Sequence, residues 1–142
     1  MPNKKSFLDT NIWLYAFIRS DDHRKTDAAK RLIESNAITT SSQVINEMCV
    51  NLLKKTGLLE EDISGIIASF YNRYEIIEFS RDILLHASTL RSTYNFSFWD
   101  SLIVSSALHS EAELLYTEDM HNGLVVEKTL RIVNPFTTPA EA

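Results

Sequence analysis

Short stretches with the character of β-strands alternate along this chain with longer stretches of helical periodicity. The candidate strands are residues 5–9, 37–39, 75–79, 114–116 and 130–133. The candidate helices are residues 12–18, 24–36, 43–55, 61–74, 81–94 and 99–110. Strands that are separated by helices form βαβ units, in which the strands run parallel and helices cover both faces of the sheet. The alternation therefore predicts an α/β domain.

Local signals at the ends of these stretches support the alternation. Ser41 or Ser42 suits the N-cap of the helix that follows, and Gly57 suits its end. Residues 20–23 are predicted to form a loop. The stretch from Trp99 to Ala107 is apolar apart from small serines, so we expect this helix to lie deep in the domain.

The length of the chain is that of one domain. It has 142 residues, of which 44% are apolar, and this is enough for one core without disulfide or metal staples. Because no repeat, low-complexity segment or linker interrupts it, we expect one domain over residues 1–136 and a C-terminal tail at residues 137–142.

Cysteine usage and hydropathy predict a cytoplasmic protein. Cys49 is the only cysteine, which excludes an internal disulfide and fits a reducing compartment. It lies on the apolar stripe of its helix, where we expect a buried structural thiol. The apolar residues after Lys5 are interrupted by Asp9 and Asn11, unlike those of a signal peptide. No apolar run approaches the ~18 residues that a membrane span needs.

The formal net charge of −5 restricts the possible functions. Proteins that bind nucleic acid generically usually have a basic surface, so this charge argues against that class. It predicts weak binding to bulk nucleic acid unless basic residues cluster near a site. It is compatible with an enzyme that concentrates carboxylates around metal ions.

Four acidic residues fall where a parallel sheet of this kind places its ligands. Asp9 ends the first strand, and Glu47 lies in the second turn of the helix after the strand 37–39. Asp100 opens the apolar helix, and Asp119 follows the strand 114–116. Ligands of open α/β sheets bind beyond the carboxyl ends of the strands. We therefore expect these four carboxylates to converge at one edge of the sheet.

Such a cluster has a specific chemistry. Carboxylates within several ångströms of one another repel, and some take up protons unless cations neutralise them. Mg²⁺ and Mn²⁺ accept hard oxygen ligands and keep waters in their coordination shell. One or two such ions activate a water and stabilise charge on phosphoryl and leaving oxygens. The predicted reaction is hydrolysis of a phosphodiester.

Each acid also has an ordinary structural explanation. Asp9 could cap the first helix, and Ser97 with Asp100 fits a capping box. Asp119 could be a turn residue, and Glu47 a solvated helix residue. Taken together, however, all four fall at the same edge of the predicted sheet.

At these acids the sequence resembles the PIN-domain family, most closely the VapC-type toxins of toxin–antitoxin pairs. The resemblance extends from Phe7 to Pro135. Four segments carry it, in the order of the family's motifs: Phe-Leu-Asp-Thr-Asn at 7–11, Ile-Asn-Glu-Met at 45–48, Phe-Trp-Asp-Ser-Leu-Ile at 98–103 and Tyr-Thr-Glu-Asp-Met at 116–120.

This resemblance implies a three-layer α/β/α fold with a mostly parallel sheet of short strands. It implies a metal-dependent endoribonuclease that uses a metal-activated water, forms a homodimer and is inhibited by a cognate antitoxin. Asp9, Glu47 and Asp100 would bind Mg²⁺ or Mn²⁺ directly or through water. Asp119 would hold a metal ion or its water. The polar residues that would form hydrogen bonds around these acids are Thr10, Asn11 and Thr117.

Three other functions remain open at this point. One is a PIN nuclease of RNA maturation without an antitoxin, and another is a binding module whose acids are only caps. The third is a receiver-like signalling domain, which needs adjacent acids after the first strand and a lysine after the fifth. The fit to this third class is poor, because Asp9 has no acidic neighbour and Val133 is followed by Asn134.

Several residues near the predicted site have less certain roles. His121 is two residues after Asp119, but a solvated turn histidine is the commoner case. Glu118 is as well explained by a solvated surface position. Arg24 and Lys25 are weak candidates for guiding RNA phosphates. Aromatic residues are expected mainly in the core, with some left for a partner: Trp13, Tyr15, Phe17, Phe70, Tyr71 and Tyr74. Two lysines are expected to complement a helix C-terminus: Lys54 and Lys55.

Overall fold

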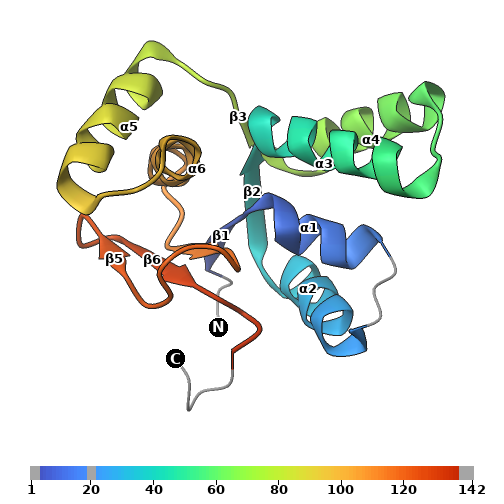
Figure 1. Ribbon diagram of the computed structural model, residues 1–142, viewed down its shortest axis with the longest axis horizontal. Helices are drawn as coiled ribbons and strands as arrows, with labels where there is room; N and C mark the ends of the chain where they lie inside the picture. The colour runs from blue at the N-terminus through green and yellow to red at the C-terminus, as the bar shows by residue number, and fades with distance from the viewer. Residues whose placement is uncertain (1–3, 19–21, 138–142) are drawn as a thin grey trace.

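The computed structural model describes residues 4–18 and 22–137, which form an α/β domain around one six-stranded sheet (Figure 1). The strands lie in the order β3-β2-β1-β4-β6-β5. Their bounds are β1 Lys5–Leu8, β2 Ala37–Ser41, β3 Glu75–Ile77, β4 Leu114–Tyr116, β5 Val125–Val126 and β6 Leu130–Val133. All neighbouring strands pair in parallel except β5, which pairs antiparallel with β6. The predicted mostly parallel sheet of short strands is therefore confirmed.

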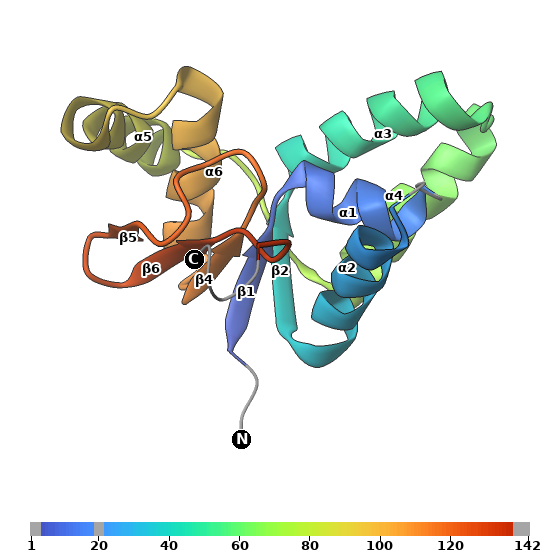
Figure 2. The same cartoon turned by 60° about the horizontal axis from the view of Figure 1, so that its bottom comes forward.

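Helices cover the sheet from both sides. Their bounds are α1 Thr10–Phe17, α2 His23–Ser35, α3 Ser42–Thr56, α4 Glu60–Arg73, α5 Arg81–Tyr94 and α6 Phe98–His109. Figures 1 and 2 show α1 to α4 on one side of the sheet and α5 with α6 on the other. The predicted three-layer α/β/α arrangement is thus confirmed, and α3 with α4 projects from it as a pair.

The predicted ends of α3 are confirmed. The Ser41 hydroxyl accepts the Val44 N–H at 3.2 Å, and Gly57 ends α3 with φ of 70°. Lys54 and Lys55 lie in the last turn of α3, as expected. The predicted strand 75–79 is shorter, because β3 pairs only with β2 and that strand ends at Ser41.

The core lies between the sheet and the two helical layers, and Cys49 is buried in it as predicted. Trp13 is fully buried, with its ring centre 4.8 Å from that of Phe70. By contrast, Phe17 and Tyr71 are exposed, so the aromatic set divides between core and surface.

The prediction that the α6 helix lies deep is correct from Ser101 to Ala107 and wrong for Trp99. The first turn of α6, with Phe98 and Trp99, is exposed, whereas the following residues pack into the domain.

Two expectations lie outside the described residues, namely the loop at 20–21 and the tail from 138 onward. Within the described residues, no helix combines the length and apolar character that crossing a membrane requires.

Candidate active site

Asp9 lies at the centre of the site, where β1 passes into α1. Its N–H donates to the Tyr116 carbonyl at 3.0 Å, so it continues the pairing of β1 with β4. The residue is only 8% exposed. Oδ1 accepts the Thr10 N–H at 2.7 Å, and Oδ2 accepts the Thr117 hydroxyl at 2.8 Å. Asp9 is therefore a helix cap that also reaches the residues after β4.

Glu47 comes to the same place from α3. Its Oε2 accepts the Thr10 hydroxyl at 2.8 Å, and its Oε1 accepts an N–H of Gln43 at 3.2 Å. Gln43 was not among the predicted site residues. The signal that would have found it is its spacing of four residues from Glu47, which places both side chains on one helix face.

Asp119 joins the hydrogen bonds around Asp9 through Asn11 of α1 and through Thr117. Its Oδ2 accepts an amide N–H of Asn11 at 2.9 Å, and its own N–H donates to the Thr117 hydroxyl at 3.2 Å. Thr117 therefore links Asp9 with Asp119. Each of the three polar residues named from the resemblance forms a hydrogen bond with one of the acids.

Asp100 approaches from α6, on the other side of the sheet. The Ser97 hydroxyl accepts the Asp100 N–H at 3.1 Å and caps this helix. Burial raises the pKa of Asp100, and the charges of Asp119 and Glu47 raise it further against the Ser97 hydrogen bond. The four carboxylates named here, Asp9, Glu47, Asp100 and Asp119, are called the acid edge below.

Burial and repulsion between the acids of the acid edge raise the pKa values of Asp9 and Asp100. Burial raises the pKa of Asp9 from 3.8 to about 6, although the hydrogen bonds from Thr10 and Thr117 lower it. The charges of Glu47 and Asp100 also contribute to this rise. A carboxylate with this pKa is destabilised in its ionised form, and a nearby cation would relieve that destabilisation.

The donors of the acid edge fit a hard divalent cation. Within the described residues, none of the four carboxylates forms an ion pair with a lysine, arginine or histidine. The buried Asn11 Oδ1, on the amide that contacts Asp119, accepts no hydrogen bond from the residues that the structure describes. However, no three acidic, histidine or cysteine side chains in the described part of the chain are grouped closely enough to hold one ion. Hydroxyl and amide groups donate to the carboxylates of Asp9, Glu47 and Asp119.

Glu118 has a structural role that the sequence did not indicate. It lies between Thr117 and Asp119, and its side chain is 24% exposed. It forms an ion pair with Lys25 and accepts the Tyr15 hydroxyl at 2.8 Å. The Lys25 nitrogen also lies 5.0 Å from the centre of the Tyr15 ring. These contacts attach the segment after β4 to α1 and α2.

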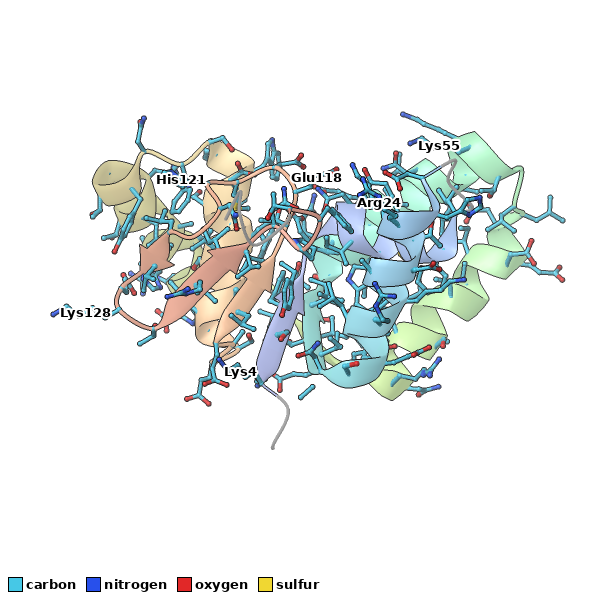
Figure 3. All side chains as sticks on the ribbon, turned by 90° about the horizontal axis from the view of Figure 1, so that it is seen from below. Lys4, Arg24, Lys55, Glu118, His121 and Lys128 are labelled. Atoms are coloured by element: carbon cyan, nitrogen blue, oxygen red, sulfur yellow. The ribbon has the colours of Figure 1, made fainter. Side chains whose placement is uncertain are left out.

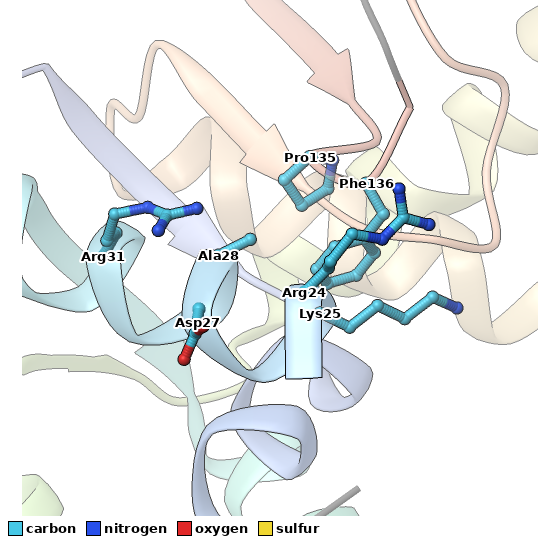
Figure 4. Close-up of a pocket in the computed structure, with 7 residues that line it drawn as sticks. All are labelled: Arg24, Lys25, Asp27, Ala28, Arg31, Pro135 and Phe136. Atoms are coloured by element: carbon cyan, nitrogen blue, oxygen red, sulfur yellow. The ribbon is translucent and has the colours of Figure 1, made fainter. Parts of the chain in front are cut away.

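Basic residues cluster beside this network. A cavity of about 310 Å³ lies between α2 and residues 135–136 (Figure 4). Three cationic side chains, Arg24, Lys25 and Arg31, line it with one acid, Asp27. Figure 3 shows Arg24, Glu118 and His121 towards one end of the sheet and Lys4 at the other. The net charge therefore does not prevent a local basic surface near the acid edge.

The sequence of this chain matches the model of a known family. That family is described as PIN domain, and the match covers residues 6–121 of 142. Among curated proteins, no sequence matches significantly.

Solved structures resemble the fold along most of its length. A toxin–antitoxin complex from Klebsiella pneumoniae superposes with a TM-score of 0.70 at 21% identity, covering 94% of this chain and 99% of that one. VapC20 of Mycobacterium tuberculosis, described as a sarcin–ricin loop cleaving toxin, gives 0.65 at 20% identity over 80% and 89% of the chains. VapBC2 of Rickettsia felis, bound to a DNA fragment from its promoter, gives 0.58 at 25% identity over 92% and 99%.

Proposed function

We propose, from the premise that this chain belongs to the PIN-domain family, that it is a metal-dependent endoribonuclease and the toxin of a toxin–antitoxin pair. The observation that carries the proposal is the acid edge. Acids from four separate elements interact electrostatically there, and the buried Asp9 has a pKa raised to about 6. Maintaining such a cluster costs stability, which is the usual sign of a functional site.

In this proposal Asp9, Glu47 and Asp100 bind Mg²⁺ or Mn²⁺ directly or through water, and Asp119 holds an ion or its water. The bound cation supplies an activated water and stabilises charge on the phosphate. The protein contributes orientation: Thr10 and Thr117 hold the carboxylates of Glu47 and Asp9 by hydrogen bonds of 2.8 Å each. Replacing such supporting residues typically lowers metal affinity or activity about 10–100-fold.

RNA is the proposed substrate. The structurally similar VapC20 is described as cleaving the sarcin–ricin loop. The cationic cavity along α2 supplies a surface that attracts phosphates close to the acid edge. Lys25 is paired with Glu118, and Arg24 lies 4.0 Å from an Asp22 oxygen but is 90% exposed. Arg31 and Arg24 are therefore better candidates for phosphate contacts than Lys25.

A cognate antitoxin and a second copy of the chain are the proposed protein partners. The similar structures from Klebsiella pneumoniae and Rickettsia felis are described as a toxin–antitoxin complex and as VapBC2. This chain exposes apolar side chains on α3 and α5 that such contacts would cover: Val50, Leu53, Leu84 and Leu85.

Cleavage of structured RNA tests the nuclease. We expect the wild type to cleave with Mg²⁺ or Mn²⁺ but not in EDTA, and Asp100→Asn to lose at least ~100-fold of the rate. Glu113→Gln is the matched control, because this exposed acid lies at the opposite end of β4. Equal cleavage by the wild type and Asp100→Asn would exclude the assignment.

Expression in bacteria tests the toxin. Growth arrest by the wild type, relieved by Asp100→Asn, supports a toxin, whereas normal growth with an active nuclease indicates an RNA-maturation enzyme.

A further inference from the structure

Glu118 is an acid beside the acid edge that does not belong to it. Tyr15 of α1 donates its hydroxyl to Glu118 Oε1 at 2.8 Å, and Lys25 of α2 forms an ion pair with Oε2. Lys25 also donates to the Tyr15 hydroxyl at 3.2 Å, so the three side chains contact one another. Because an ammonium group already neutralises this carboxylate, Glu118 is a poor ligand for a divalent cation. The members of the acid edge, in contrast, form no ion pair among the described residues.

Aromatic rings hold the ammonium group of Lys25 in place. Its nitrogen lies 5.0 Å from the centre of the Tyr15 ring and 5.4 Å from that of Phe136. These two rings pack edge to face, with centres 5.1 Å apart and an angle of 79° between them. Figure 4 shows Lys25 and Phe136 lining one cavity. The hydrogen bond to Glu118 raises the pKa of Lys25, so the side chain stays charged and is attracted to both rings.

The face of α1 that binds Glu118 also binds Asp119. Asn11 and Tyr15 are four residues apart, which places their side chains on one face of the helix. The Asn11 amide donates to Asp119 Oδ2 at 2.9 Å, and the Tyr15 hydroxyl donates to Glu118. Two consecutive acids of the chain are thus bound by two consecutive turns of α1. Glu118 is the more strongly held of the two, because Lys25 adds an ion pair on its other oxygen.

Thr117 connects this attachment with the centre of the acid edge. Its hydroxyl donates to Asp9 Oδ2 at 2.8 Å and accepts the Asp119 N–H at 3.2 Å. Because Thr117 and Asp119 are the chain neighbours of Glu118, a shift of Glu118 moves both of them. The position of Asp119 relative to Asp9 therefore depends on a carboxylate that is itself outside the acid edge.

We propose that Tyr15 and Lys25 are positioning residues, which act through Glu118 to hold Asp119 beside Asp9 for the binding of a divalent cation. This inference rests on the proposed function, and it adds residues of α1 and α2 that do not touch the cation. A segment that is ordered before binding loses less conformational freedom when the cation binds, and the affinity is correspondingly higher. A purely structural role would change the free energy of unfolding and leave the cation affinity of the folded protein unchanged.

Tyr15→Phe tests the proposal without changing any charge, because it removes only the hydroxyl. Calorimetry measures the Mn²⁺ affinity of the folded protein, and NMR in EDTA measures the exchange of the Asp119 N–H with deuterium. We expect the affinity to fall about 10-fold, the lower end of the range for groups that support metal ligands. The Asp119 N–H should exchange faster than in the wild type, because its hydrogen bond to Thr117 opens more often.

Tyr71→Phe is the matched control for this variant. Tyr71 of α4 donates its hydroxyl to Glu78 at 2.8 Å, which is the same kind of bond at the same length. Both residues lie outside the segment that carries Asp119 and outside the helices that hold it. The Mn²⁺ affinity and the exchange of the Asp119 N–H should therefore equal those of the wild type.

Lys25→Met separates positioning from the effect of charge. Loss of a positive charge by itself strengthens Mn²⁺ binding, because one source of repulsion on the cation is removed. Positioning predicts the opposite sign, with Mn²⁺ bound about 10-fold more weakly than by the wild type. Lys30→Met is the control, because it removes an exposed positive charge from the same helix, and it should bind Mn²⁺ at least as tightly as the wild type.

Three results would overturn the positioning role: a wild-type Mn²⁺ affinity in Tyr15→Phe, unchanged exchange of its Asp119 N–H, or tighter Mn²⁺ binding by Lys25→Met. Cleavage of RNA is scored separately. If the variants bind Mn²⁺ as predicted but the wild type cleaves no RNA, the nuclease alone is refuted. If the wild type cleaves RNA and Tyr15→Phe keeps its affinity, the positioning role alone is refuted. A wild type that binds no Mn²⁺ refutes both.

Discussion

Replacing Asp9 with asparagine should stabilise the metal-free protein at neutral pH. Asp9 is buried, and its pKa is raised from 3.8 to about 6, so its ionised form is less favourable in the folded than in the unfolded chain. Asparagine keeps the size of the side chain and the acceptor for the Thr10 N–H, and it carries no charge. Removing the charge of Asp9 should therefore increase the free energy of unfolding of the metal-free protein.

The magnitude follows from the pKa. A shift of about 2 pKa units at 1.36 kcal/mol each corresponds to about 3 kcal/mol at pH 7. The Thr117 hydroxyl loses its carboxylate acceptor, which costs about 1 kcal/mol. The net gain for Asp9→Asn is about 2 kcal/mol in the free energy of unfolding, or roughly 6–8 °C in Tm.

The raised pKa also determines how the stability difference between Asp9→Asn and the wild type changes with pH. Because the folded-state pKa of Asp9 is raised, its favourable contribution is fully present below pH 3.8 and is lost as pH rises through about 6. The advantage of Asp9→Asn is therefore largest at pH 7 and disappears near pH 4.

Urea unfolding in EDTA at several pH values measures this difference, with Glu113→Gln as the control for removal of an exposed charge. Saturating Mn²⁺ should reverse the order, because only the wild type retains the full donor set. An Asp9→Asn protein that is less stable than the wild type at pH 7 in EDTA would refute the reasoning.

Three further variants test the supporting contacts. Thr117→Val removes the hydrogen bond to Asp9 and the one accepted from the Asp119 N–H. Calorimetry should then show a Mn²⁺ affinity lowered about 10–100-fold, with Thr117→Ser close to the wild type. Equal affinity of all three proteins would contradict this role. Lys25→Met leaves the Glu118 carboxylate unpaired and should lower the free energy of unfolding by about 1–2 kcal/mol, whereas an unchanged urea midpoint would show that the ion pair contributes nothing. Gly57→Ala, at φ of 70°, should cost about 1 kcal/mol in the same assay, and a neutral result would contradict the strain expected there.

The arrangement of strands and helices was largely predictable because most helices show a helical hydrophobic periodicity and alternate with short stretches of strand character. The strand β5 was missed because its two residues, Val125 and Val126, are too few to show a period. The turn between β5 and β6 contains Glu127 and Lys128 at positive φ. Glutamate and lysine rarely adopt this conformation, so their presence did not indicate a turn.

Contacts between distant residues were predictable only through the topology of the sheet or the family resemblance. The bond between Thr117 and Asp9 joins residues 108 positions apart, and only the family resemblance named Thr117 as a partner of the acids. In the structure, the parallel pairing of β1 with β4 brings the two residues together. The ion pair between Lys25 and Glu118 follows from no local pattern. Periodicity likewise could not show that the first turn of α6 is exposed, so Trp99 was wrongly predicted to be buried.

The central claim is that the acid edge binds a divalent cation, and anomalous diffraction from a crystal soaked in Mn²⁺ measures this directly. The account predicts a manganese peak with oxygens of at least two of Asp9, Glu47 and Asp100 at about 2.0–2.6 Å, or joined to it through ordered water. A fully soaked crystal with no peak at these residues, or with manganese bound only elsewhere, would contradict it.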